Sequence, residues 1–297
     1  MELLKLLEGV RSPFLDSLFS AITRLGEETV VVIVLCVILW CIDKRIAYSI
    51  GIVYVLSALA VQCMKVCFQI ERPWVIEPTL KPVRSALETA TGYSFPSGHT
   101  QSAAALFGTL GTQVKRAYTK AMSFLLVILV AFSRLYLGVH TINDITVSLL
   151  LTLIFIFVAV KTNAGSVTDK TRLKLLASLM LLYTISIAVI AILLSSYGKI
   201  ESDDLSDCIK AVGAGAGFIV GMYIERRYIE YDEQMKSVLK QAIKLIIGIA
   251  GVLIIKEAPN LLINIGLVSD TVRYFLMLFW VTALSPLVFK KMFHVKQ

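Results

Sequence analysis

The sequence predicts an all-α polytopic membrane protein, a helical bundle with about nine transmembrane helices. Of its 297 residues, 57% are hydrophobic and only 17% are charged, whereas a soluble domain carries about a quarter charged residues. The apolar residues also form long blocks that approach or reach the roughly 20 residues needed to cross a bilayer. Together, these two observations exclude an ordinary soluble domain.

The expected spans follow one another along the chain, each bounded by charged or turn-forming residues. The residues before the first span, 1–27, mix leucines with charges and predict a helical segment in the membrane interface, broken near Pro13. Residues 211–221 are rich in glycine and alanine, which is typical of close packing between helices. The nine spans are expected at residues 28–42, 46–64, 97–114, 121–138, 144–160, 175–197, 209–224, 242–256 and 272–289.

Basic residues follow the odd-numbered spans, and this distribution explains the net charge of +8. Loops rich in Lys and Arg lie in the cytoplasm under the positive-inside rule. We therefore expect no nucleic-acid partner, an N-terminus outside the cell membrane, and a C-terminus inside. The exception is the stretch 65–84, whose basic residues we assign to a site on the extracytoplasmic side.

The polar segment 161–174 divides the chain into two parts. All residues that suggest a chemical function lie before it, so residues 28–160 are interpreted as a catalytic transmembrane core. Residues 161–174 are then a cytoplasmic linker, and residues 175–297 form a transmembrane extension whose purpose the sequence does not indicate.

Lys65 and Arg72 are the first pair of charged residues in this core that suggest a chemical function. They are seven residues apart, about two helical turns, so their side chains are expected on one helix face, and Pro73 is expected to end that helix. An arginine fork and a lysine charge together suit a phosphate group. The alternative is two interfacial residues whose charged ends reach water.

The expected span at 97–114 is rich in small residues and begins with Ser97, Gly98 and His99. The free N–H groups at a helix start bind anions, and glycine permits close approach of a ligand to the backbone. An imidazole in the first turn can donate a proton to a leaving oxygen. The alternative is an ordinary helix cap with a histidine at the interface.

Arg134, His140 and Asp144 form the third group of polar residues. An unpaired arginine near the end of a span is costly unless it binds something. Asp144 follows His140 by four residues, so on a helical turn its carboxylate can hold one ring nitrogen and leave the other free for nucleophilic attack. The alternative is a packed histidine with Asp144 as a helix cap.

Read together, the three groups spell Lys-x6-Arg-Pro, Pro-Ser-Gly-His and Ser-Arg-x5-His-x3-Asp, from Lys65 to Asp144. This combination resembles the type 2 phosphatidic acid phosphatase (PAP2) superfamily, which also includes glucose-6-phosphatase and the vanadium haloperoxidases. The resemblance implies a phosphatase with a helical core that needs neither a metal nor another cofactor. The nine-span layout looks more like the glucose-6-phosphatase branch than like the six-span lipid enzymes.

The resemblance also implies a role for each motif residue. His140 is the implied nucleophile, oriented by Asp144, and His99 is the acid that protonates the leaving group. The phosphate is then held by the side chains or backbone of five residues, namely Lys65, Arg72, Ser97, Gly98 and Arg134.

These observations lead to one main expectation and three alternatives. We expect a membrane phosphatase that forms a phosphohistidine and acts on lipid phosphates or diphosphates, such as polyprenyl diphosphate, phosphatidate or phosphatidylglycerophosphate. The same site could instead pass the phosphoryl group to a lipid or sugar, or hydrolyse a sugar phosphate. The non-enzymatic alternative is a transporter of an anion or lipid. Membrane lipids are the expected partners, and the oligomeric state is left open.

Overall fold

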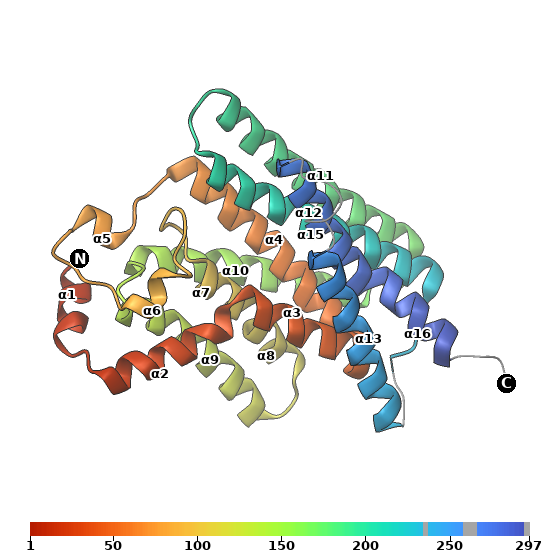
Figure 1. The fold of residues 1–297 in the computed structure, drawn as a ribbon. Helices are drawn as coiled ribbons and strands as arrows, with labels where there is room; N and C mark the ends of the chain where they lie inside the picture. Colours follow the sequence, from red (N-terminus) through yellow and green to blue (C-terminus); the bar gives the residue numbers. More distant parts are fainter. Residues whose placement is uncertain (234–236, 258–265, 294–297) are drawn as a thin grey trace.

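The computed structural model describes residues 1–233, 237–257 and 266–293, and every regular element in these ranges is a helix. Seven of the described helices are long and apolar enough to cross a membrane, and there are eight candidates if a bent pair near the N-terminus counts as one span. The protein is therefore an all-α polytopic membrane bundle (Figure 1), as predicted. The predicted count of nine spans is not confirmed.

Two short helices, α1 and α2, precede the first apolar helix, α3. The helix is interrupted between α1 and α2, and α2 begins at Pro13, where the sequence predicts an interruption. The Ser12 hydroxyl caps α2 by accepting a hydrogen bond from the Leu15 amide. α2 packs against α9 through the rings of Phe19 and Tyr136. The bounds are Glu2–Gly9 for α1, Pro13–Thr23 for α2, Glu28–Val37 for α3, with a π-helical turn at Ile38–Ile42, and Ala117–Tyr136 for α9.

The bent pair consists of α2 and α3. Residues 13–26 and 28–42 meet at an angle of 53°, because the helix stops at Gly26 and Glu27 adopts an extended conformation. α3 therefore begins at Glu28, directly after the bend.

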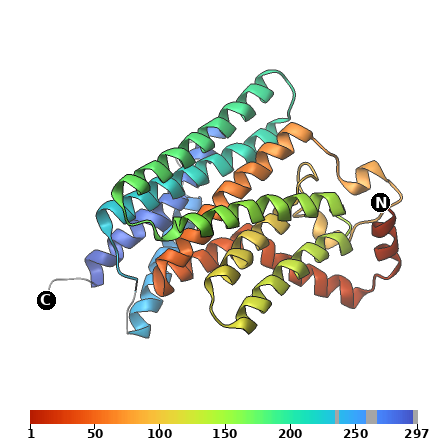
Figure 2. The same cartoon turned by 180° about the vertical axis from the view of Figure 1, so that it is seen from behind.

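Helix α4, Lys44–Phe68, is the central element of the bundle. Asp43 caps its start, accepting a hydrogen bond from the Arg45 amide. α4 contacts helices from both halves of the chain: α7 (Gly98–Ala103) and α10 (Ile142–Thr162) from the first, α11 (Lys170–Ser196) and α12 (Ser202–Ile224) from the second. Figures 1 and 2 show α11 and α12 running beside it.

The loop between α4 and α7 contains two single-turn helices, α5 (Pro73–Ile76) and α6 (Arg84–Leu87), and lies beside α1 at one end of the bundle (Figure 1). The helix that follows is interrupted: α7 passes into a π-helical turn at Ala104–Gly108 and then into α8, Thr109–Gln113. The whole stretch is shorter than the roughly 20 residues of a full span. The span expected at 97–114 is therefore not among the candidate spans.

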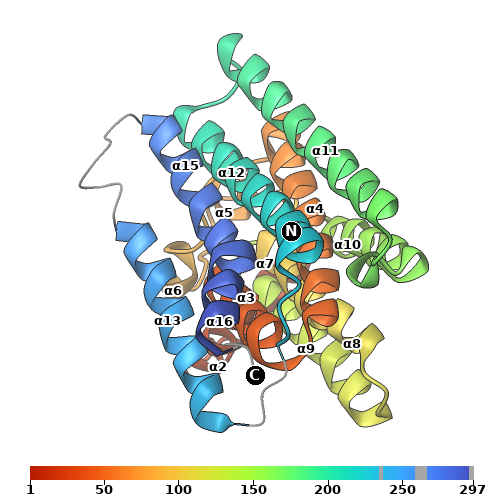
Figure 3. The same cartoon turned by 90° about the vertical axis from the view of Figure 1, so that its right-hand side faces the viewer.

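The second half of the chain packs along α4 with α12 at its centre (Figure 3). A Cβ atom on Gly213 or Gly217 of α12 would collide with the backbone carbonyls of Thr271 and Phe275 in α15. Residues 211–221, which the sequence predicts to pack closely with another helix, therefore pack closely against α15. The remaining bounds are Val238–Glu257 for α13, Gly266–Phe279 for α15 and Ser285–Phe293 for α16, with π-helical turns at Glu225–Ile229 and Trp280–Leu284.

Candidate active site

Arg72 does not lie on the helix that carries Lys65, which corrects one step of the sequence reasoning. α4 ends at Phe68 because Gln69 adopts the left-handed conformation, with φ 52°. Arg72 is extended and precedes α5, and Pro73 begins that helix instead of ending one, as proline does in a first turn. The Arg72 guanidinium is fixed by the carbonyls of Thr91, Gly92 and Val139.

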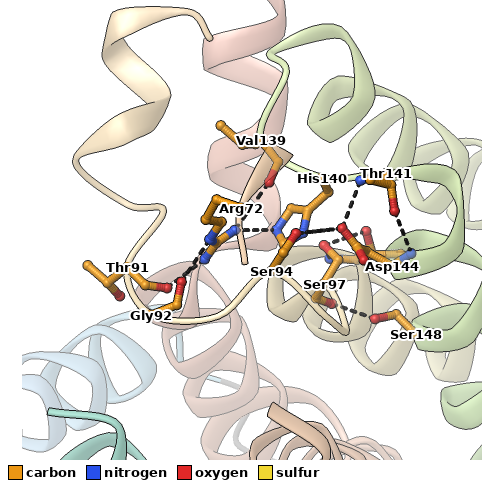
Figure 4. Close-up of polar contacts among 11 residues, drawn as sticks. Arg72, Thr91, Gly92, Ser94, Ser97, Val139, His140, Thr141, Asp144 and Ser148 are labelled. Carbon is orange, nitrogen blue, oxygen red and sulfur yellow. Dashed lines mark hydrogen bonds and ion pairs between the residues drawn. The ribbon is translucent and has the colours of Figure 1, made fainter. Parts of the chain in front are cut away.

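The side chain of Arg72 meets His140, which lies in the loop between α9 and α10. Nη1 of Arg72 is 3.1 Å from Nε2 of His140, while Nδ1 of His140 is 3.4 Å from Oδ2 of Asp144 (Figure 4). A guanidinium only donates and a carboxylate only accepts, so the contacts fit the tautomer with its proton on Nδ1. The lone pair of Nε2 then faces the cationic side of the site.

His140 is almost completely buried, and this burial has an electrostatic consequence. Desolvation lowers the pKa of the His140 imidazole well below its usual range, and the nearby charge of Arg72 acts in the same direction, while the hydrogen bond to Asp144 opposes both. The imidazole is therefore neutral at physiological pH. A neutral imidazole is the form that can act as a nucleophile.

Asp144 is held at the start of α10 by three donors that converge on a single oxygen. Oδ2 accepts hydrogen bonds from the Thr141 amide at 2.7 Å and from the Ser94 hydroxyl at 2.6 Å, in addition to its contact with His140. Thr141 and Asp144 also cap the helix reciprocally. The helix cap and the histidine contact, which were alternatives in the sequence, therefore occur together.

Ser97 caps α7, and its backbone joins the same group of residues. Its amide donates to the Asp144 carbonyl at 3.2 Å, and its own carbonyl accepts from the Ser148 hydroxyl at 2.7 Å (Figure 4). The space beside Gly98 is open, since a Cβ built there would have no atom within 4 Å. Nε2 of His99 is buried and has no hydrogen-bond partner within the described ranges.

Arg134 is completely buried in the last turn of α9. Its Nη1 donates to the Thr23 hydroxyl at 2.8 Å, but Nε and Nη2 are buried without a partner in the described part of the chain. A buried guanidinium with two free donors requires an explanation. A bound anion would satisfy both donors.

Lys65 completes the cationic group. Its side-chain ammonium makes no hydrogen bond or ion pair with any described residue, and it lies within electrostatic range of Arg72 and Arg134. His99 lies within range of both arginines, Lys65 and His140. The structure thus gathers the residues of all three motifs into one site, which we call the cationic cup: Lys65, Arg72, Ser97, Gly98, His99, Arg134, His140 and Asp144.

The cup opens on a cavity of about 310 Å³. Gly98 and His99 form part of its wall, and α12 and α15 of the second half of the chain form another part. Within the described residues, no group of three or more His, Cys, Asp or Glu side chains is placed to hold a metal ion.

Sequence reasoning missed several contributors to the site. Ser94, which bonds to Asp144, lies outside the motif that follows it, and Thr23 belongs to the segment interpreted as interfacial. Gly26 packs closely against the backbone of His99, because a Cβ atom on Gly26 would be 2.6 Å from the His99 carbonyl oxygen. No local pattern marks these residues, since each acts through a contact with a distant part of the chain.

The cup combines cations and a buried imidazole–carboxylate pair in a helical membrane bundle, a combination that suits an anionic ligand. Two family models match the sequence: "PAP2 superfamily" over residues 45–167 and "PAP2 superfamily phosphatase, transmembrane extension" over residues 209–297. Together they cover more than half of the chain, and the first includes every residue of the cup. The chain belongs to the PAP2 superfamily.

Two relatives share sequence over long stretches. The chain is 29% identical over 226 residues to sphingosine-1-phosphate phosphatase 2 of Mus musculus, an alignment covering 72% of this chain and 60% of the relative. It is 28% identical over 160 residues to a probable sphingosine-1-phosphate phosphatase of Dictyostelium discoideum, covering 48% of this chain and 37% of that one. The alignments thus span 60% or less of each relative's length.

The crystal structure of Aquifex aeolicus LpxE superposes with a TM-score of 0.46 and 27% sequence identity, over 54% of this chain and 93% of LpxE.

Proposed function

We propose that this chain is a metal-independent membrane phosphatase that hydrolyses lipid phosphates or diphosphates through a phosphohistidine on His140. One observation carries the proposal: the buried imidazole is held between the carboxylate of Asp144 and the guanidinium of Arg72. This arrangement orients a neutral nucleophile toward the place where cations would hold a phosphate. Phosphoryl transfer depends mainly on such positioning and on charge stabilisation.

In the first step, Nε2 of His140 attacks phosphorus, and the bond from phosphorus to the leaving oxygen breaks. The charge of the imidazolium that forms is stabilised by Asp144, which holds the Nδ1 proton. The cations of Arg72, Arg134 and Lys65 face the phosphate oxygens, as do the hydroxyl of Ser97 and the amide of Gly98.

His99 supplies the proton for the leaving oxygen. A bound phosphate dianion favours the charged imidazolium of His99, because an opposite charge nearby stabilises the protonated form. Once the leaving alcohol has taken the proton, His99 is neutral and can act as a base. In the second step it accepts a proton from water, the hydroxide attacks phosphorus, and inorganic phosphate leaves as His140 is restored.

A lipid substrate is supported by two observations. One named relative is a sphingosine-1-phosphate phosphatase and the other is named a probable one. The cup also lies at the end of apolar helices, where an amphiphile in the bilayer can reach it. A phosphorylated lipid of sphingoid, polyprenyl or glycerolipid type is therefore the proposed substrate. The distribution of Lys and Arg among the loops supports a site on the extracytoplasmic side of the cell membrane.

The test is release of inorganic phosphate by the purified protein in detergent micelles containing EDTA. We expect hydrolysis of lipid phosphates with EDTA present, inhibition by vanadate, and loss of activity in His140→Ala. After brief reaction with ³²P-labelled substrate and denaturation, label that is stable to base and labile to acid should remain on the wild type and be absent from His140→Ala.

The comparison variant is His294→Ala, which replaces the histidine that lies outside the described residues and outside all three motifs. It should keep wild-type activity and label. Full activity in His140→Ala, or activity that EDTA abolishes, would refute the proposal. Label recovered on an added lipid or sugar acceptor instead of inorganic phosphate would identify a phosphotransferase.

A further inference from the structure

The cavity beside the cup is lined partly by residues outside the three motifs. The first half of the chain contributes Glu28 and Tyr54, and the second half contributes Asp207 and Lys210 of α12 and Tyr274 of α15. Gly98 and His99 of the cup line the same cavity, so it offers space for the substrate atoms that adjoin a phosphate bound in the cup. Those atoms distinguish one phosphate ester from another.

Glu28 is the charged group of this wall without a direct partner. Asp207 and Lys210 form an ion pair at 3.0 Å, so their charges largely cancel. Glu28 lies within electrostatic range of that pair and of the hydroxyls of Tyr54 and Tyr274. Its carboxylate makes no hydrogen bond or ion pair with a described residue, and it faces the cavity.

The charges of the cup make this carboxylate significant. The positive charges of Lys65, Arg72 and Arg134 exceed the negative charge of Asp144 by two. This excess matches the charge of a phosphate close to its dianionic form. The phosphate thus neutralises the cup but not Glu28. Because Glu28 and His99 line the same cavity, an ammonium group on the substrate is the kind of charge that would neutralise Glu28.

Asp204, in the first turn of α12, adds a negative charge near the cup. Asp204 lies within electrostatic range of Lys65, and a Cβ on Gly92 would be 2.9 Å from its carboxylate oxygen. The carbonyl of Gly92 is one of the acceptors that fix Arg72. His99, which the proposed function assigns to the leaving oxygen, lines the same cavity, and its buried Nε2 has no partner among the described residues.

Building on the function proposed above, we infer that Glu28 is a specificity-determining residue that binds a substrate ammonium group, so that the enzyme prefers lipid monophosphates with a free amine near the phosphate. A charged hydrogen bond between an ammonium and a carboxylate is about twice as strong as a bond between neutral groups. A glutamate in the first turn of a helix also stabilises the helix dipole. That effect would be the same for every substrate, which makes substrate preference the decisive measurement.

The experiment compares two substrates that differ only at the amine, sphingosine 1-phosphate and N-acetylsphingosine 1-phosphate, in mixed detergent micelles. The quantity of interest is the ratio of their kcat/KM values. We expect the wild type to favour the free amine, and Glu28→Gln to reduce the ratio about tenfold, mainly through KM for the amine. Asp203→Asn, an exposed carboxylate near the start of α12 that does not line the cavity, should leave the ratio unchanged.

A second measurement needs no variant and so does not depend on how Glu28→Gln folds. Sphingosine should inhibit the wild type competitively at concentrations about tenfold lower than N-acetylsphingosine. Equal inhibition by the two compounds, an unchanged ratio in Glu28→Gln, or an equal change in Asp203→Asn would each overturn the inference. Phosphate release from both substrates with no preference would leave the proposed phosphatase standing while removing the ammonium site.

Discussion

The hydroxyl of Thr23 accepts a hydrogen bond from Nη1 of Arg134 at 2.8 Å, across 111 residues of sequence and inside the buried part of the bundle. This is the one described hydrogen bond of the Arg134 side chain, whose Nε and Nη2 are free. The N-terminal segment is thus part of the site, because it fixes the orientation of a guanidinium proposed to bind phosphate. Its second contact is Gly26, which lies against the backbone of His99.

Replacing Thr23 by valine should lower kcat/KM about tenfold, since a hydrogen bond to a charged group contributes about 1.5–3 kcal/mol. Thr23→Ser keeps the hydroxyl and should restore most of the activity. Steady-state phosphate release by both variants, with their thermal unfolding midpoints measured alongside, checks this prediction. Equal losses in the valine and serine variants would mean that packing, not the hydrogen bond, is responsible.

Replacing Gly26 by alanine should reduce activity about ten- to a hundredfold, because a displacement of about 1 Å in a catalytic group has an effect of this size. The new Cβ would lie 2.6 Å from the carbonyl oxygen of His99 and 2.9 Å from Cγ1 of Val130, so the backbone that carries His99 must shift. Gly9→Ala is the matched control, since nothing lies within 4 Å of its Cβ position. Comparable activity in the two variants would refute the prediction.

Replacing Ser94 by alanine should lower kcat about tenfold with little change in KM. The hydroxyl is one of the donors to Oδ2 of Asp144, so its loss relaxes the orientation of His140 without removing a phosphate contact. Ser196→Ala removes an exposed hydroxyl that bonds within its own helix and should have no effect. A rise in KM alone would show that Ser94 acts on substrate binding.

The pH dependence of kcat/KM should show no acid limb from His140 near pH 6.5. Its pKa lies well below the usual range because of burial, so the imidazole remains neutral and nucleophilic as the pH falls through 6.5, and the reaction loses this group only at lower pH. kcat/KM reports ionisations of the free enzyme and substrate. An acid limb near pH 6.5 that remains after correction for ionisation of the substrate phosphate would contradict this prediction.

The sequence was sufficient to predict the fold class and the grouping of the three motifs. Long apolar blocks require helices in a membrane, and charges that recur at short spacings within such blocks must be used together. Lys65 and Arg72 were nevertheless expected to lie near each other for a wrong reason. The two residues lie within electrostatic range of each other across a loop and not along one helix, because the left-handed Gln69 ends α4 before Pro73 is reached.

Contributions from distant parts of the chain could not be predicted. Ser94, Thr23 and Gly26 become part of the site only through tertiary contacts, and Glu28 resembles any acidic residue at the start of a helix. The role of Asp207 and Lys210 was missed because the chain after residue 174 contains no catalytic motif. Their positions depend on the packing of α12 along α4, which residue spacing does not encode.

The cavity that joins His99 to α12 and α15 is built by both halves of one polypeptide. The residues proposed to break the phosphate bond come from the first half, as does Glu28, while Asp207, Lys210 and Tyr274 of the second half complete the wall. The second half can therefore change its part of the wall without disturbing the reacting atoms. Chimeras that exchange residues 202–293 between homologues should retain the chemistry and the amine preference proposed for Glu28, while altering selectivity for the rest of the lipid.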